Sequence, residues 1–150
     1  MVKKLSSNNF YSMYQFDNND NDFSCMQSNT LKTLFLHKGI LEIELSFEDK
    51  DKKINLTSHQ GLVILPDVKI NIVKNDSYLI LVQSIEDDKP IIDITIDEKG
   101  NREEKKIEKY KIIDNPKKIN KPWGYEVWIS WFKHHHVLKK IYMEEGNKCS

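Results

Sequence analysis

The sequence predicts an all-β protein, a sandwich or a barrel, on three observations. Apolar and polar residues alternate with a period of two in several stretches, which is typical of strands with one buried face. Turn-forming residues separate these stretches at short intervals, as they do in antiparallel β-folds. The chain also has 18 isoleucines and no alanine, a composition that favours strands over helices.

The first half of the chain gives the clearest strand pattern. Aromatic residues within 10–16 predict a strand or an apolar anchor, and an Asn/Asp-rich loop follows at 17–22. The segment LKTLFLHKG, 31–39, is expected to be a strand that ends in a glycine turn. The further strands expected in this half are 41–47, 54–56, 62–65, 68–72 and 78–84.

The second half is more varied. Ile92, Ile94 and Ile96 predict one more alternating strand, whereas 102–113 fits either a returning strand or a short charged helix. The two prolines of NPKKINKP indicate a linker. After it come two expected strands: a Trp-rich strand with Trp123, Tyr125, Val127, Ile129 and Trp131 on one face, and 137–143.

Composition excludes several classes of function. The 23 basic and 23 acidic residues cancel, so no broad field attracts nucleic acid or an anionic membrane. No apolar run is long enough to span a bilayer, and the N-terminus lacks the apolar core of a secretory signal. Cys25 and Cys149 are too few for a disulfide framework or a cysteine zinc cluster. A cytoplasmic location is therefore expected.

The segments HKGILEIEL, HQGLVILPDVKINIV and YLILVQS together resemble the second half of a cupin barrel. In that family, two motifs supply histidines and a carboxylate that hold a metal ion. Anchored on Pro66, the glycine and histidine places of the second motif are Val68 and Asn71 here, and the first motif's neighbourhood offers only 25–28 and Lys32. The resemblance thus implies a degenerate cupin-like (double-stranded β-helix or jelly-roll) barrel with no metal site.

The C-terminal segment KPWGYEVW, followed by VLKKIYMEEGNKCS, resembles the start of another cupin domain, that of type II mannose-6-phosphate isomerases, a domain associated with mannose-1-phosphate guanylyltransferases. Family members interconvert mannose 6-phosphate and fructose 6-phosphate, which supplies GDP-mannose and surface-polysaccharide synthesis. The resemblance implies a divalent ion (Zn, Mn or Fe) whose ligands would follow Ser150, so no cofactor is expected in this chain. The matching positions are Lys121, Pro122, Trp123, Gly124, Tyr125, Glu126, Leu138, Lys139, Lys140, Gly146 and Ser150.

Two functions remain open. The first is an incomplete or degenerate relative of the cupin sugar-phosphate isomerases, inactive as this chain alone and an isomerase only if further C-terminal sequence completes it. The second is a non-catalytic module that binds a sugar or nucleotide sugar, or serves in assembly. In both, the partners expected are a sugar phosphate or nucleotide sugar and a second copy of the chain in a homodimer. The expected divisions are an N-terminal strand and polar loop (1–30), a degenerate cupin-like barrel (31–113), a linker (114–122) and the leading hairpin of an incomplete second cupin (123–150).

The residues proposed to bind substrate are Lys121, Trp123, Tyr125 and Lys139; no catalytic residue is identified. Aromatic rings on one strand face can stack on a sugar, although core packing explains them equally, and lysine runs are commonly solvated. His134, His135 and His136 suggest a metal site, but they fall where a hairpin turn belongs, and a solvated turn is the simpler interpretation. Because a hairpin alone is marginally stable, 123–143 should pack on the first barrel or on another subunit.

Overall fold

Strands make up the secondary structure, and the part of the chain that is described contains no helix. The structure is a computed structural model that describes residues 1–85, 90–97, 99–133 and 135–146. Within these ranges there is also no segment of the helical, apolar kind that crosses a bilayer. The strands are β1 (Lys3–Ser7), β2 (Tyr11–Phe16), β3 (Thr30–Phe47), β4 (Lys50–Thr57), β5 (Gly61–Ile64), β6 (Lys69–Ile85), β7 (Ile92–Ile96), β8 (Arg102–Lys106), β9 (Tyr110–Ile113), β10 (Lys117–Lys121), β11 (Gly124–Lys133) and β12 (Val137–Met143).

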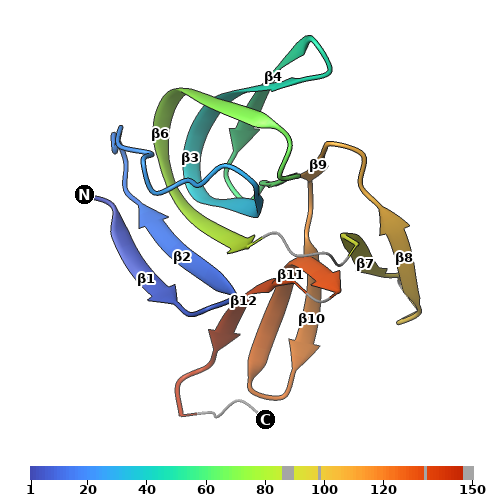
Figure 1. Cartoon of the computed structure of the whole chain (residues 1–150). Coiled ribbons are helices and arrows are strands. Elements are labelled where there is room, and N and C mark those ends of the chain that lie inside the picture. The colour runs from blue at the N-terminus through green and yellow to red at the C-terminus, as the bar shows by residue number, and fades with distance from the viewer. Residues whose placement is uncertain (86–89, 98, 134, 147–150) are drawn as a thin grey trace.

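The strands form two antiparallel sheets. The larger sheet has the order β1-β2-β6-β3-β5-β9, with β4 also paired to β3, and the smaller has the order β10-β11-β7-β8, with β12 also paired to β11. Figure 1 shows the larger sheet curling through β3, β4 and β6 in the upper part of the molecule, with β10, β11 and β12 below it. The predicted class, all-β with curled antiparallel sheets, is confirmed.

The curl depends on the long strands β3 and β6, which pair along nearly their whole length. A β-bulge between Leu36 and Lys38 inserts one extra residue into β3. Because side chains alternate between faces, this insertion changes which positions face inward. Leu36 and Leu41 are therefore both buried in the same inner core although they are an odd number of positions apart in the sequence. The strand expected to end at Gly39 instead continues through it, because the bulge absorbs the change of direction.

Two apolar clusters lie on the two faces of the larger sheet. The inner cluster fills the curl and includes Phe16, Leu34, Leu41, Leu56 and Leu81 among its buried members. The outer cluster joins the back of the larger sheet to the smaller one: it brings together Leu31, Phe35, Val63, Val82, Ile113, Ile129, Phe132 and Leu138. The segment 123–143 was expected to pack on the first barrel or on another subunit, and its Ile129, Phe132 and Leu138 pack against the larger sheet of this chain.

Several local expectations need correction or completion. The polar strand β1 has no alternating pattern and was not expected; it is paired to β2. Residues 102–113, left open between helix and strand, form β8 and β9. Residues 117–121 of the expected linker form β10, because the turn at 122–123 folds them back onto β11.

The predicted Trp-rich face of β11 is interrupted. A bulge between Trp128 and Ser130 shifts the alternation. As a result Ile129 and Phe132 both pack in the outer cluster, while Trp131 lies against Trp128 with 5.2 Å between ring centroids. Trp131 therefore does not share the inward face with Val127 and Ile129, and this part of the prediction was wrong.

Candidate functional site

A cavity of about 740 Å³ opens between the loop that precedes β3 and the beginning of β6. Lys32, Asp67 and Lys69 are its charged lining residues, and its uncharged polar lining combines amides with one hydroxyl: Asn21, Gln27, Ser28, Asn29 and Asn71. Apolar side chains, among them Phe23 and Met26, form the rest of its wall. Amides both donate and accept hydrogen bonds, so this lining suits a ligand rich in hydroxyl groups with apolar C–H faces.

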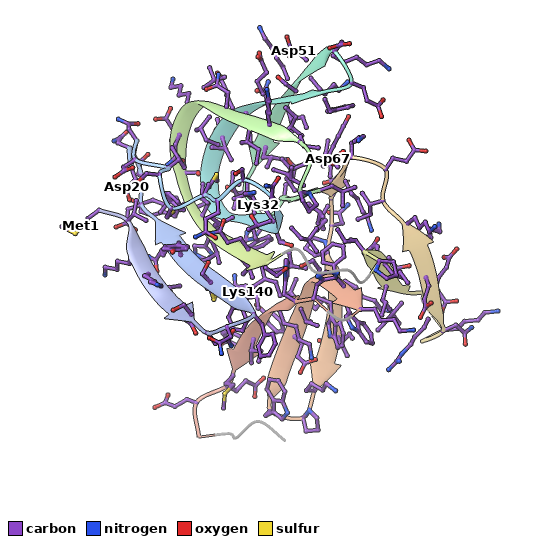
Figure 2. All side chains as sticks on the ribbon, viewed as in Figure 1. Met1, Asp20, Lys32, Asp51, Asp67 and Lys140 are labelled. Carbon is purple, nitrogen blue, oxygen red and sulfur yellow. The ribbon has the colours of Figure 1, made fainter. Side chains whose placement is uncertain are left out.

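Lys32 places an amine inside this cavity. It lies on β3 at an inward position shared with Leu34 and Leu36, and only 3% of its surface is exposed. Its Nζ donates to the carbonyl oxygen of Thr30 at 3.3 Å, which uses one of its three N–H donors. Figure 2 shows Lys32 within the curl of the sheet. Burial lowers the pKa of the Lys32 amine to about 8, because the charged form loses hydration.

The wall formed by the 17–29 loop is fixed by two residues of β6. Gln83 accepts a hydrogen bond from the backbone N of Gln27 at 3.0 Å and donates to the carbonyl oxygen of Cys25 at 2.7 Å. Asn75 donates to the carbonyl oxygens of Asp17 and Asp20 at 3.4 and 3.2 Å. The Asn/Asp-rich loop, whose role the sequence leaves open, is thus a hydrogen-bonded wall of the cavity.

Both places that the sequence resemblance assigned to motifs meet at this cavity. Met26, Gln27, Ser28 and Lys32 come from the first, and Val68 and Asn71 come from the second. Their side chains do not fit a transition metal, which needs several imidazole, thiolate or carboxylate donors about 2 Å from one point. Across the residues that the structure describes, no group of three His, Cys, Asp or Glu side chains is arranged to hold such an ion.

The four residues proposed from sequence to bind substrate lie elsewhere, around the smaller sheet. Lys121 is exposed beside the β10–β11 turn, and Trp123 in that turn is buried, with 4% of its surface exposed. Tyr125 lines a cavity of about 300 Å³ together with Lys118 and Lys140, whereas Lys139 lines a separate groove of about 370 Å³. The four are not brought to one cavity, and their role in binding stays a prediction.

The aromatic rings of β11 already have neighbours on their faces. Tyr125 stacks on Tyr142 with 4.9 Å between centroids, and the ammonium of Lys118 lies 4.2 Å from the Tyr125 centroid. The ammonium of Lys139 lies 3.9 Å from the Trp128 centroid. These cation–π contacts place the lysines against the rings that an aromatic sugar platform would use.

One histidine of the triplet, His136, has a different place from the one expected. The turn itself is present, because the backbone N of Phe132 donates to the carbonyl oxygen of His136 at 2.9 Å. The expected solvation is wrong for His136, which has 5% of its surface exposed. Its Nε2 lies 2.8 Å from the Thr33 hydroxyl and its Nδ1 lies 2.8 Å from the Ser84 hydroxyl. His134 lies outside the described residues, as do Cys149 and Ser150 of the GNKCS motif.

This hydroxyl–imidazole network joins the two sheets. Thr33 and Ser84 belong to the larger sheet, whereas Ser130 of β11, 3.0 Å from the Thr33 hydroxyl, belongs to the smaller one. Hydroxyls can donate or accept, so a neutral imidazole is fully satisfied between two of them. The network therefore positions the sheets. Sequence reasoning missed it because single threonines and serines in strands carry no distinguishing signal.

Acidification is expected to destabilise the fold through His136. Burial, with a smaller contribution from His135, lowers the pKa of His136 from 6.5 to about 4. As the pH falls through this window, the unfolded chain binds a proton that the folded chain does not, so the free energy of unfolding decreases by up to about 3 kcal/mol. Urea denaturation at several pH values measures this decrease. His136→Gln lacks this titration and should lose less stability; parallel pH profiles for the two proteins would contradict the assignment.

Comparisons with known proteins give little further information. No protein-family model matches the chain, and no curated protein sequence matches it. Among solved structures, a vicilin from Corylus avellana (hazelnut) is similar, with a TM-score of 0.34 and 14% sequence identity. The match covers 69% of this chain and 34% of the vicilin chain. A likeness at this level does not establish a shared fold, and the fold described above is defined by the strand pairing alone.

Proposed function

We propose that this chain is a cupin-like module that binds a small sugar-type ligand inside the curl of its larger sheet. The observation that supports the proposal is the convergence of the buried Lys32 amine with several amide side chains at one cavity. A buried amine with donors to spare favours a ligand that offers oxygen acceptors. Sugar phosphates and nucleotide sugars have this chemistry. The cytoplasmic location and the homodimer stay part of the proposal.

The mechanism of binding follows from the cavity. The Lys32 ammonium donates hydrogen bonds to ligand oxygens in a poorly hydrated environment, where charge-assisted bonds are strong. Asn71 and Gln27 offer both donors and acceptors to sugar hydroxyls, and Phe23 offers an apolar surface to the C–H face of the ring. Gln83 keeps the loop wall in place before the ligand arrives, which lowers the entropic cost of binding.

Lys32→Met is expected to weaken binding of mannose 6-phosphate or GDP-mannose by about tenfold or more. The reason is that a hydrogen bond from a charged donor contributes about 1.5–3 kcal/mol. Isothermal titration calorimetry measures the affinity. Folding should be preserved, because methionine fills similar space without an amine to desolvate, and a thermal melt checks this.

Lys139→Met is the matched control, since Lys139 lines the separate groove and was proposed from sequence to bind substrate. We expect the Lys139→Met variant to bind mannose 6-phosphate or GDP-mannose with the same affinity as the unmodified chain. If Lys139→Met weakens binding and Lys32→Met does not, the ligand binds at the smaller sheet and the cavity at Lys32 is not the site.

The incomplete-isomerase hypothesis stands second, because its metal chemistry needs ligands that the described residues do not offer. A coupled assay of mannose 6-phosphate isomerisation with added Mn²⁺ or Zn²⁺ separates the two proposals. Turnover by this 150-residue chain would favour the isomerase and overturn the non-catalytic module.

A further inference from the structure

Lys32 is buried, which sets it apart from the other lysines that the structure describes. It is the lysine found among the buried residues of that part of the chain, with Leu34 and Leu36 on the same inward face of β3. Its Nζ donates a hydrogen bond to a neutral carbonyl oxygen, that of Thr30. An amine held among apolar side chains is poorly hydrated, and here its residue lines a cavity with space for a small ligand.

This environment changes the protonation of the amine. Desolvation lowers the pKa of Lys32 to about 8 from its ordinary value of 10.5. At neutral pH about a tenth of Lys32 is then uncharged, compared with less than about one in a thousand for an ordinary lysine. The uncharged amine is the nucleophile in Schiff-base formation, and buried lysines in proteins serve that chemistry.

We propose that Lys32 condenses reversibly with the open-chain carbonyl of a small phosphorylated aldehyde or ketone bound in the cavity. The Nζ lone pair attacks the carbonyl carbon and a carbinolamine forms. Its C–O bond then breaks, and the oxygen leaves as water with the two hydrogens that the amine has lost, so that a C=N bond remains. No electrons are gained or lost overall, and hydrolysis by water reverses the step.

The rim of the cavity offers a cationic side chain that could bind the phosphate of such a ligand. Lys69 lines the same cavity and is exposed. Asp67 lines the cavity too, and its carboxylate is engaged in an ion pair with Lys109, which also lies 3.7 Å from Glu48. A ligand with its carbonyl at Lys32 and its phosphate at Lys69 therefore meets two lysines and one carboxylate that is already paired. This inference rests on the proposed function, because it concerns the same cavity, and adds covalent chemistry to it.

The test is reductive trapping. The chain is incubated with glyceraldehyde 3-phosphate and sodium cyanoborohydride, which reduces an imine to a stable secondary amine, and peptide mass mapping locates the adducts among the 22 lysines and the N-terminus. We expect Lys32 to be modified at least about tenfold faster than the average exposed lysine. Its rate should reach half its maximum near pH 8, because only the uncharged amine reacts.

Variants and the N-terminal amine complete the design. Lys32→Arg keeps the charge without a nucleophilic amine and should lose the fast adduct, whereas Lys53→Arg, at an exposed position of β4, should keep it. The α-amino group of Met1 is a second kind of amine in the chain, but it forms an ion pair with Asp20 at 2.7 Å, and mapping resolves it from Lys32. Adducts spread over the exposed lysines with no excess at Lys32 in the unmodified chain would overturn the proposal, whatever the variants do.

A ligand without a carbonyl distinguishes this inference from the proposed function. Glycerol 3-phosphate cannot form an imine, yet it offers the same phosphate and hydroxyl groups. If it binds in a manner that depends on Lys32 and glyceraldehyde 3-phosphate leaves no adduct there, the amine chemistry is wrong and the binding function stands. If neither ligand engages Lys32, both proposals are wrong.

Discussion

Gly39→Ala is expected to lower the free energy of unfolding by about 3 kcal/mol or more. Gly39 has φ +105°, a conformation that L side chains rarely adopt. A Cβ there would lie 2.2 Å from the carbonyl oxygen of Asp76 and 2.7 Å from the Cα of Ser77. Both atoms belong to the backbone of β6, so relief would separate the two strands that carry the curl. Denaturant unfolding monitored by tryptophan fluorescence measures the loss.

Gly100→Ala is the control for this prediction. Gly100 also has a positive φ, +84°, but no atom lies within 4 Å of the Cβ that alanine would add. Gly100→Ala should therefore lower the free energy of unfolding only through backbone strain, by about 1 kcal/mol. Equal losses for the two variants would show that the close approach of β3 and β6 contributes nothing.

Phe132→Ala is expected to cost about 3–5 kcal/mol, because it leaves a cavity in the outer cluster. The Phe132 ring has 1% of its surface exposed and packs in the cluster that contains Leu31, Phe35 and Val82 of the larger sheet. It therefore supports the docking of the smaller sheet. Hydrogen exchange should show the amides of β11 and β12 losing protection before those of β3 and β6.

Val137→Ala tests the same hairpin without the cluster, since 46% of the Val137 surface is exposed. Surface truncations of this kind change stability by about 0.5 kcal/mol or less. If Val137→Ala and Phe132→Ala destabilise the chain equally, the smaller sheet is not held by the outer cluster.

The strands were predictable where alternation is strong. The spacing of Leu41, Ile43 and Leu45 alone predicts a half-buried strand, and all three side chains are buried in the structure. The continuation of β3 through Gly39 was not predictable, because a glycine that turns the chain and a glycine that permits a bulge look alike in sequence. β10 was missed for a related reason, since its pairing to β11 outweighs the two prolines around it.

The cavity at Lys32 was not predicted as a site. The cupin resemblance draws attention to Lys32 and Asn71 only because they stand where metal ligands are expected, and the structure brings both to one cavity. The sequence gives no indication that the Lys32 amine is buried, because burial depends on the loop wall that Gln83 fixes from a distant part of the chain. The buried network at His136 was missed because its partners lie about 50 to 100 residues away in sequence.

The pairing of β7 with β11 has a consequence for synthesis of the chain. β7 forms a hairpin with β8 and pairs on its other side with β11, through Phe132 opposite Asp93 and Lys133 opposite Ile92. A two-stranded hairpin alone is only marginally stable. The polypeptide leaves the ribosome N-terminus first, so β7 and β8 emerge before their partner strand β11. We therefore expect β7 and β8 to become stably folded only after translation has passed Lys133, so that this part of the fold forms late.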